Sequence, residues 1–249
     1  MPVAPVSKAP DRIAGMFDAI AGRYDFLNHL LSAGIDRHWR TVAIRSLALT
    51  GRERVLDLCT GTGDLAIAAL RAQPPASRVV GVDFSGAMLR VGEDKLRKAL
   101  LADRIAMVQG DATRIPVADA SVDAVTIGFG IRNVEDMDAA CAELIRVLKP
   151  GGRLAILEFA VPTLPVFSAF YGWYVRRVLP QIGRVLSRND SAYAYLPASI
   201  SAFATPDEFV KILRQAGFSE ISPTRLMLGS VILYTAHKGE GQGPWAREP

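Results

Sequence analysis

Residues 54–70, RVLDLCTGTGDLAIAAL, predict a strand, a glycine-rich turn and a helix in direct succession. The apolar run 55–58 is typical of a buried parallel strand, and the Ala-rich run that opens at Asp64 is typical of a helix. Gly61 and Gly63 let the backbone turn sharply and let a ligand approach it closely. A strand, turn and helix of this kind form the first unit of a nucleotide-binding α/β fold.

The charges around this turn favour one class of ligand. The spacing Gly61-x-Gly63-x-x-Ala66 also fits the dinucleotide fingerprint, whose pyrophosphate sits on a helix N-terminus. Here Asp64 occupies that terminus and Asp57 lies in the preceding strand. Two carboxylates repel a phosphate but suit a ligand with an ammonium and a sulfonium, such as S-adenosylmethionine. For Asp64 alone, a simple helix N-cap is the alternative.

Length and composition indicate one α/β domain with an extra segment, because the 249 residues are half hydrophobic. The net charge of +4, without a dense Lys/Arg run, does not indicate a nucleic-acid partner. Cys59 and Cys141 form no CxxC, which fits a cytoplasmic location, and no metal site is expected. We expect neither a signal peptide nor a transmembrane helix, because the N-terminus lacks an apolar segment and no run of about 18 apolar residues exists.

Short apolar runs alternate with helical patterns along the chain. After 55–58, the expected strands are 78–82, 105–109, 122–127, 154–159, 220–225 and 231–237, the last two as a hairpin-like pair at the sheet edge. Helices are expected over 85–102 and 136–148, and Lys149-Pro150-Gly151-Gly152 should end the second of these. The alternation predicts a Rossmann-like α/β fold with a mostly parallel seven-stranded sheet and helices on both faces.

The segment before the first strand reads as a helical N-terminal cap. Apolar residues recur there at helical spacing, and Gly22 and Gly34 should divide it into two or three short helices. We expect residues 1–249 to form a single domain. Its expected parts are the cap at 11–49, a cofactor-binding core at 50–164, a substrate- or membrane-facing insertion at 165–200, a C-terminal helix and strands at 201–238, and a disordered tail at 239–249.

The insertion combines bulky aromatic side chains with arginines. Such a composition suits a membrane surface or a lid over an apolar ligand. A core helix with a solvated basic edge is the alternative. The residues in question are Phe167, Phe170, Tyr171, Trp173, Tyr174, Arg176, Arg177, Arg184 and Arg188.

Three acidic residues follow expected strands of the sheet. Asp57 ends the first apolar run, Asp83 follows the second strand, and Asp111 follows the third. Ligands of such sheets bind outside the carboxyl ends of the strands, so these side chains should lie near one site. Asp83 is at the distance along the chain where an acidic residue binds a ribose hydroxyl pair.

Three stretches of the chain carry a family resemblance. They are FDAIAGRYDFLN (17–28, continuing to Trp39-Arg40), residues 55–64 with Asp83 and Gly110-Asp111-Ala112, and GFGIRNV (128–134) with RVLKPGG (146–152). Together they resemble the class I S-adenosylmethionine-dependent methyltransferases, and within them the quinone-biosynthesis C-methyltransferases of the menaquinone and ubiquinone pathways. The resemblance runs from about Ala14 to His237. At Gly128, menaquinone-type members tend to have Gly and ubiquinone-type members Ser.

The resemblance implies S-adenosylmethionine as the cofactor and a lipophilic polyprenyl quinol as the substrate. The reaction expected is C-methylation of demethylmenaquinol to menaquinol, with the ubiquinone-pathway benzoquinol reaction, or both, as the alternative. The residues expected to bind the cofactor are Asp57, Gly61, Thr62, Gly63, Asp83, Asp111, Ala112 and Gly128.

Ionising a phenol makes the neighbouring ring carbon nucleophilic, so the site must stabilise a phenolate. Arg132 is expected to do this because it is permanently charged, and Asn133 to orient the other ring oxygen. For Arg132 the alternative is an ion pair with Glu135 or Asp136. Tyr24, Asp25 and His29 of the cap are the remaining catalytic candidates.

Other functions and partners stay open at the level of sequence. An NAD-dependent oxidoreductase fits the glycine spacing, but the two carboxylates oppose it. A non-catalytic scaffold that binds cofactor or quinone is a further alternative. Because a polyprenyl tail is insoluble in water, peripheral contact with the inner face of a membrane is expected, and a homodimer is left open.

Overall fold

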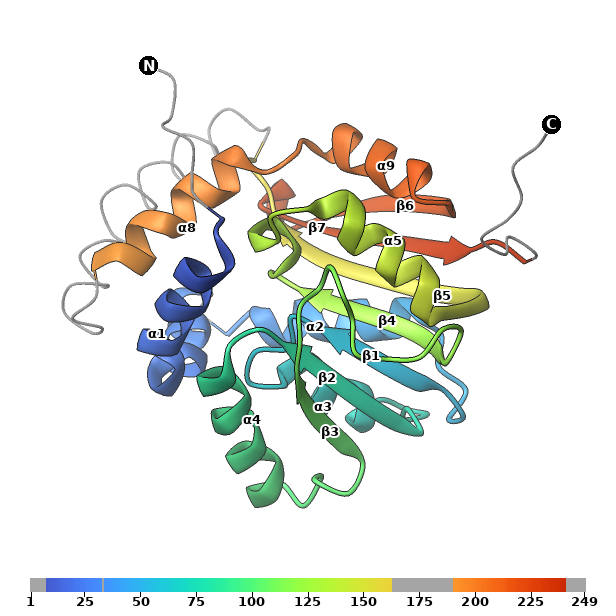
Figure 1. Ribbon diagram of the computed structural model, residues 1–249, viewed down its shortest axis with the longest axis horizontal. Coiled ribbons are helices and arrows are strands. Elements are labelled where there is room, and N and C mark those ends of the chain that lie inside the picture. The colour runs from blue at the N-terminus through green and yellow to red at the C-terminus, as the bar shows by residue number, and fades with distance from the viewer. Residues whose placement is uncertain (1–7, 33, 163–189, 241–249) are drawn as a thin grey trace.

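A seven-stranded sheet forms the centre of the protein. The computed structural model describes residues 8–32, 34–162 and 190–240. The strand order is β3-β2-β1-β4-β5-β7-β6 (Figure 1). The first five strands, β1 to β5, are parallel, while β7 runs antiparallel to both β5 and β6. The strands are β1 (Arg54–Leu58), β2 (Arg78–Asp83), β3 (Ile105–Gln109), β4 (Val122–Gly128), β5 (Leu148–Phe159), β6 (Phe218–Leu226) and β7 (Val231–Lys238).

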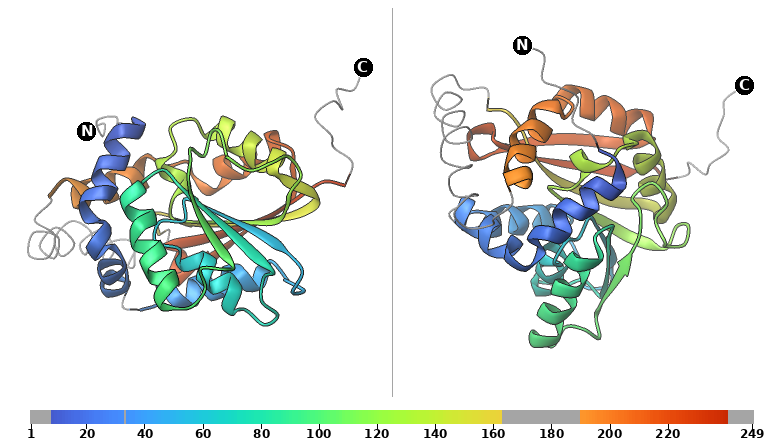
Figure 2. Two further views of the ribbon diagram at one scale, coloured as in Figure 1. Left: turned by 60° about the horizontal axis from the view of Figure 1, so that its bottom comes forward. Right: turned by 60° about the vertical axis from the view of Figure 1, so that its left-hand side comes forward.

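Helices cover both faces of this sheet, as Figure 2 shows. On one face lie α2 (Asp36–Ser46), α3 (Asp64–Arg71) and α4 (Gly86–Lys98), whose apolar side chains form one core with Val55, Ala124 and Leu157. On the other lie α5 (Met137–Val147) and α9 (Pro206–Gln215), which form a second core with Leu56 and Ile127. Neighbouring strand residues point to opposite faces, so each strand supplies both cores. The fold class predicted from the sequence is confirmed.

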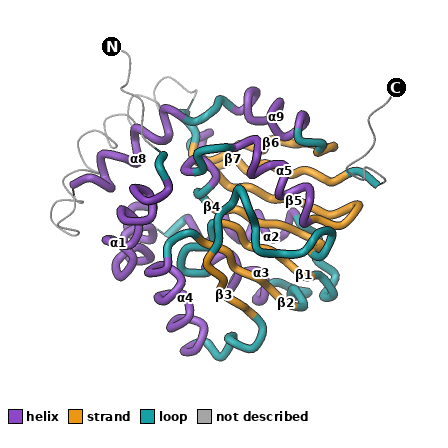
Figure 3. The backbone as a smooth tube through the Cα atoms, in the orientation of Figure 1, coloured by secondary structure: helices purple, strands orange, loops and turns teal. Residues whose placement is uncertain are grey.

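The cap consists of α1 (Pro10–Leu31) and α2. α1 packs against α4 and against α8 (Asp190–Ala202), and in Figures 1 and 3 the parallel strands end beside these helices. The helix break predicted at Gly22 is wrong, because α1 is one continuous helix of 22 residues that includes Gly22. One glycine costs a helix only about 1 kcal/mol, which tertiary packing outweighs. The second predicted break is observed, since Gly34 has φ +79° after the helix ends.

The segment after α5 differs from the expected one. The helix ends at Val147, close to the predicted position, but β5 begins at Leu148 instead of residue 154. Leu148 pairs with Val122, and a register irregularity between Val122 and Ala124 lets the strand continue past Gly151 at φ +70°. The predicted edge pair is found as β6 and β7.

Parts of the predicted domain division lie outside the described residues. These are the insertion up to residue 189, with all of its aromatic and arginine side chains named above, and the tail from residue 241. Within the described parts of the chain, no helix has the length and apolar composition needed to cross a membrane. Nor is any group of three His, Cys, Asp or Glu in these parts arranged to hold a metal ion.

Glu53 organises the turn that leads into β1. Its carboxylate is 5% exposed and accepts hydrogen bonds from the amide and hydroxyl of Thr50, at 2.9 Å each, and from the amides of Gly51 and Arg52. It also pairs with Arg153 of β5 at 3.0 Å. Burial alone would raise the pKa of Glu53, but the hydrogen bonds from Thr50 and Arg153 lower it to about 2.

Glu53→Gln should lower the free energy of unfolding at pH 7 by about 1.5–3 kcal/mol, because the amide loses charge-assisted hydrogen bonds. The ionised carboxylate stabilises the fold fully above its ordinary pKa of 4.5, and this stabilisation is lost as the pH falls through about 2. Urea unfolding of both proteins should therefore show a stability difference that shrinks below pH 4.5. A difference that is constant with pH would contradict this account.

Candidate active site

A cavity of about 630 Å³ opens at the carboxyl ends of β1, β2 and β4. This is a typical volume for a small-molecule site. The strand order reverses between β1 and β4, which is where open α/β sheets bind their ligands. Leu58, Val82 and Gly128 line it from these strand ends, and Phe17 and Tyr24 line it from α1. The cap therefore forms one wall of the site.

The turn between β1 and α3 depends on its glycines. Gly61 and Gly63 have φ of +56° and +83°, which side chains rarely adopt. Gly61 lines the cavity, and a Cβ there would meet no atom within 4 Å. Across the cavity, a Cβ on Gly128 would lie 2.7 Å from Leu65 Cδ1, so a side chain at this position requires Leu65 to move.

The structure places Asp57 beneath this turn and not in the cavity. Its carboxylate is 1% exposed and accepts hydrogen bonds from the hydroxyls of Thr60 and Thr126, at 2.5 and 2.7 Å, and from the Ala66 amide at 3.1 Å. Burial raises the pKa of Asp57 to about 6, although these hydrogen bonds oppose the rise. The Asp57 carboxylate therefore holds the turn in place through these hydrogen bonds to buried neighbours.

Asp83 and Asp111 do line the cavity, as expected, together with Ala112. Asp83 Oδ2 accepts a hydrogen bond from the Gly61 amide at 2.8 Å, and Oδ1 accepts one from the Ser85 amide at 2.9 Å. Burial raises the pKa of Asp83, against the effect of these amides. Asp111 Oδ1 accepts from the amide and hydroxyl of Thr113, so it shapes the turn after β3.

Asp25 and Asp64 belong to an ion-pair network beside the turn. Lys95 of α4 lies 2.6 Å from Asp25 and 2.7 Å from Asp64. Asp25 also accepts a hydrogen bond from the Thr62 hydroxyl at 2.5 Å. Arg40 of α2 pairs with Asp64 at 3.0 Å. None of these residues lines the cavity. Their ion pairs fasten the cap to the glycine turn, and Asp64 therefore lies outside the cavity lining.

His29 extends the same network away from the cavity. Its Nδ1 lies 3.0 Å from Asp36, which also accepts a hydrogen bond from Ser32 and pairs with Arg40 at 2.7 Å. Burial would raise the pKa of Asp36, but the Ser32 hydroxyl and the Arg40 guanidinium lower it. The geometry therefore gives His29 a structural role in the cap.

Arg132 lies in the short helix η1 (Ile131–Asn133) and is 5% exposed. Its Nη1 is 2.7 Å from Glu158 Oε1 and also donates to the Phe129 carbonyl, while its Nε donates to Ser199 of α8. Glu158 of β5 is fully buried. Arg132 therefore has the structural ion pair that was the alternative, but with Glu158 and not with Glu135 or Asp136. It does not line the cavity, because its charge is turned inward toward β5.

Asn133 follows Arg132 in η1 and does line the cavity. Its Oδ1 accepts a hydrogen bond from Tyr195 of α8 at 3.0 Å. Across the cavity, burial raises the pKa of Tyr24, while a hydrogen bond with Asn28 opposes the rise. The structure therefore brings the predicted residues Tyr24, Asn133 and Asp83 to one cavity.

Sequence reasoning missed Lys8, Glu158 and Tyr195. Lys8 lines the cavity, although it precedes the cap expected at 11–49. Tyr195 lies in the aromatic segment, but no pattern there singled it out. Of the predicted site residues, the cavity is lined by Tyr24, Gly61, Asp83, Asp111, Ala112, Gly128 and Asn133, while Asp25, His29, Asp57, Thr62, Gly63 and Arg132 lie outside its lining.

The sheet order, the glycine turn and the acidic end of β2 define a class I methyltransferase fold. A putative S-adenosyl-L-methionine-dependent methyltransferase from Methanococcus maripaludis shares this fold, with a TM-score of 0.64 and 20% identity over 97% of this chain and 99% of that one. The [4+2]-cyclase SpnF shares it too, with a TM-score of 0.67 and 18% identity over the same shares of the two chains. The chain belongs to the ubiE/COQ5 methyltransferase family, whose sequence model matches residues 6–238.

Two relatives illustrate the family. The ubiquinone/menaquinone biosynthesis C-methyltransferase UbiE of Geobacter sulfurreducens is 44% identical over 229 residues, covering 92% of this chain and 89% of that protein. The demethylmenaquinone methyltransferase of Bacteroides fragilis is 41% identical over 231 residues, covering 93% and 94%. The family resemblance expected from the sequence is confirmed, and the oxidoreductase alternative is set aside.

Replacing Arg132 by Met should lower the free energy of unfolding by about 3–5 kcal/mol, because it leaves Glu158 charged and buried without its partner. The double variant Arg132→Met/Glu158→Met should regain part of this loss, since no uncompensated charge remains. Urea unfolding of the three proteins gives the values.

The exposed pair of Arg97 and Asp94 on α4 supplies the control. Arg97→Met should change stability by less than about 1 kcal/mol. An equally small loss in Arg132→Met would show that the buried pair does not hold this wall of the cavity.

Proposed function

We propose that this protein transfers a methyl group from S-adenosylmethionine to a ring carbon of demethylmenaquinol, giving menaquinol. The observation that carries the proposal is the family match over residues 6–238, which includes every described residue that lines the cavity. The named function of the Bacteroides fragilis relative supports the menaquinone branch. The benzoquinol reaction of the ubiquinone pathway is the second candidate, because the name of the Geobacter relative includes both ubiquinone and menaquinone biosynthesis.

The cavity fits S-adenosylmethionine. Asp83, at the end of β2, presents a carboxylate that can accept hydrogen bonds from two ribose hydroxyls. Gly61 leaves open space beside the turn. Among the described residues, four with carboxylates line the cavity, Asp83, Asp111, Glu135 and Asp136, and their charge favours a cationic ligand. When bound, the sulfonium supplies an electrophilic methyl group.

The reaction needs an ionised ring and a dry site. The quinol hydroxyl releases its proton to water, and the ring carbon takes the methyl group while the sulfur keeps the electron pair of the bond that breaks. The same carbon then loses its hydrogen as a second proton, which restores the aromatic ring with its oxygen still ionised, and this oxygen takes one proton back from water. The net products are the methylated quinol, S-adenosylhomocysteine and one proton. The aromatic walls Phe17 and Phe129 exclude water, and the Asn133 amide orients a ring oxygen.

Tyr195 sets the orientation of that amide. Because its hydroxyl donates to Asn133 Oδ1, the Asn133 amino group is left to donate toward the substrate. Among the described residues, the Asn133 amino group has no hydrogen-bond partner, since Tyr195 bonds only the Oδ1 atom. Positioning of this kind favours the in-line approach of ring carbon and methyl group.

The polyprenyl tail requires contact with a membrane, and we propose a peripheral one. Phe26 and Leu30 of α1 are 60% and 47% exposed, and Leu228, in the short helix η3 (Met227–Gly229), is 58% exposed. Exposed apolar side chains on a peripheral protein favour insertion at the lipid boundary. A homodimer stays part of the proposal as an arrangement to be tested.

The purified protein should convert demethylmenaquinol to menaquinol when S-adenosylmethionine is added, with mass spectrometry of the extracted quinones as the measurement. The corresponding unmethylated benzoquinol, offered in a separate reaction, tests the ubiquinone branch. Methylation of the benzoquinol alone would reassign the substrate. Methylation of neither quinol would leave a non-catalytic scaffold as the function.

Asp83→Asn should weaken binding of S-adenosylmethionine by about 10- to 100-fold, because charge-assisted hydrogen bonds of about 1.5–3 kcal/mol are lost. Calorimetry on the folded variant measures this. Asp94→Asn, in the exposed pair of α4, is the matched control and should bind as the wild type does. An unchanged dissociation constant in Asp83→Asn would remove this carboxylate from the cofactor site.

A further inference from the structure

The charges that line the cavity are unequal in sign. Its carboxylates come from Asp83, Asp111, Glu135 and Asp136, whereas Lys8 is the one cationic side chain among the lining residues that the structure describes. The phenolate that methylation requires is an anion. With no other positive side chain on the described cavity wall, Lys8 is the group that can face it.

Arg132 cannot serve as this cation in the observed arrangement. Its Nη1 is bonded to Glu158 and to the Phe129 carbonyl, and its Nε is bonded to Ser199. Turning the guanidinium toward the cavity would leave Glu158, which is 0% exposed, charged without its partner. This cost keeps the Arg132 guanidinium turned toward β5 and outside the cavity lining.

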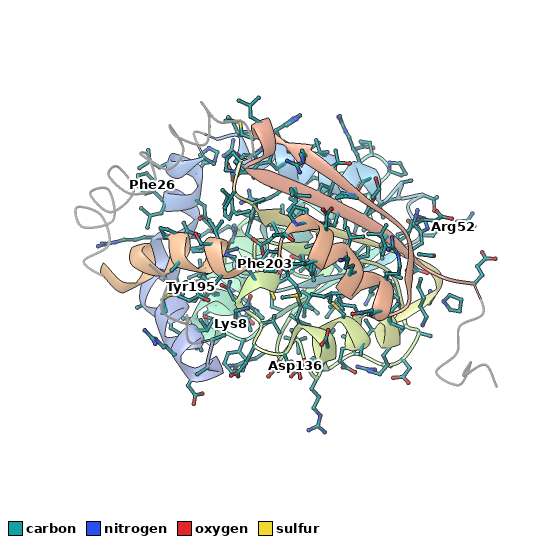
Figure 4. The ribbon with its side chains drawn as sticks, turned by 90° about the horizontal axis from the view of Figure 1, so that it is seen from above. Lys8, Phe26, Arg52, Asp136, Tyr195 and Phe203 are labelled. Carbon is teal, nitrogen blue, oxygen red and sulfur yellow. The ribbon has the colours of Figure 1, made fainter. Side chains whose placement is uncertain are left out.

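Lys8 lies two residues before α1, and its side chain reaches Val134, the residue that follows η1. Its ammonium donates to the Val134 carbonyl at 3.4 Å, a long hydrogen bond that leaves donors free. Val134 follows Asn133, so the ammonium and the Asn133 amide belong to the same wall. In the view of Figure 4, Lys8 appears between Tyr195 and Asp136.

The surroundings of Lys8 favour an anionic ligand. Within the described part of the chain, no carboxylate lies within 4.0 Å of its ammonium. At longer range, the ammonium is attracted electrostatically by Glu158 of β5 and repelled by Arg132 of η1. Glu135 and Asp136 share the cavity with it. Burial lowers the pKa of Lys8, while the charge of Glu158 opposes the fall. A partly buried ammonium without a close counter-ion is stabilised when an anion binds beside it.

We propose that Lys8 is the counter-ion of the ionised quinol and donates a hydrogen bond to its phenolate oxygen. This inference rests on the proposed function. The hydroxyl proton leaves to water, its bonding pair stays on the oxygen, and the ammonium of Lys8 keeps its three protons throughout. The positive charge thus favours ionisation of the ring and raises the electron density on the carbon that attacks the methyl group.

The direct test uses 1-naphthol, whose ionisation is followed by its absorbance. Bound to the wild type, it should ionise at a lower pH than in water. Lys8→Met keeps the length of the side chain and removes the charge, so the midpoint should rise by about 1–3 pH units. Lys211→Met, at an exposed position of α9, is the control and should behave as the wild type does. Equal midpoints in the wild type and Lys8→Met would overturn the proposal.

Kinetics give a second readout. Lys8→Met should lower kcat for demethylmenaquinol by about 10-fold or more at neutral pH, with unchanged affinity for S-adenosylmethionine. The loss should shrink as the pH approaches the ordinary phenol pKa near 10. Lys8→Arg, which keeps the charge, should retain most of the activity. An equal kcat in Lys8→Met and wild type at every pH would also overturn the proposal.

The two readouts separate this proposal from the proposed function. If the wild type does not methylate the quinol but shifts the naphthol midpoint through Lys8, the substrate assignment fails and the anion site stands. If the wild type methylates the quinol and Lys8→Met does so equally well, the function stands and the role of Lys8 is refuted.

Discussion

The ion pair of Arg132 and Glu158 fixes the wall against which the active site is built. Glu158 is fully buried and accepts hydrogen bonds from the Arg132 side chain, from the Arg132 amide and from the Phe159 amide. A buried carboxylate is tolerated only with such partners. If the segment after β4 moved away from the end of β5, Glu158 would remain buried and charged without its partner, at a large cost in free energy. Asn133 and the Val134 carbonyl are presented to the cavity from this fixed segment.

A second set of charges holds the opposite wall. Lys95 joins Asp25 of the cap to Asp64 at the start of α3, and Arg40 joins Asp64 to Asp36. These side chains are neutralised by one another and lie outside the cavity lining. The charged groups that are paired within the protein therefore stabilise the fold. Asp83 and Lys8 line the cavity instead, where they can bind ligands.

Local patterns in the sequence were enough for the sheet, the glycine turn and Asp83, because each depends on residues close together in the chain. The partner of Arg132 could not be found in this way. Glu158 lies 26 residues further on, directly after the apolar run 154–157 of β5, and only the pairing of β4 with β5 brings it near. Lys8 was missed for a similar reason, since only the path of α1 across the strand ends carries it to the cavity. Asp64 has the right sequence position for a ligand contact, but Lys95 and Arg40, from two other helices, occupy it.

The contribution of α8 to the site has a consequence for biosynthesis on the ribosome. Lys8 and Tyr24 are synthesised before any strand, whereas Tyr195 and Ser199 emerge only after β5 is complete. Because chains fold from the N-terminus as they are made, the sheet from β3 to β5 and the described residues that line the cavity can be in place before Tyr195 is synthesised. A nascent chain at this stage has the turn and Asp83 but no hydroxyl to orient Asn133. The ability to position a substrate is therefore acquired late in translation, after most of the fold already exists.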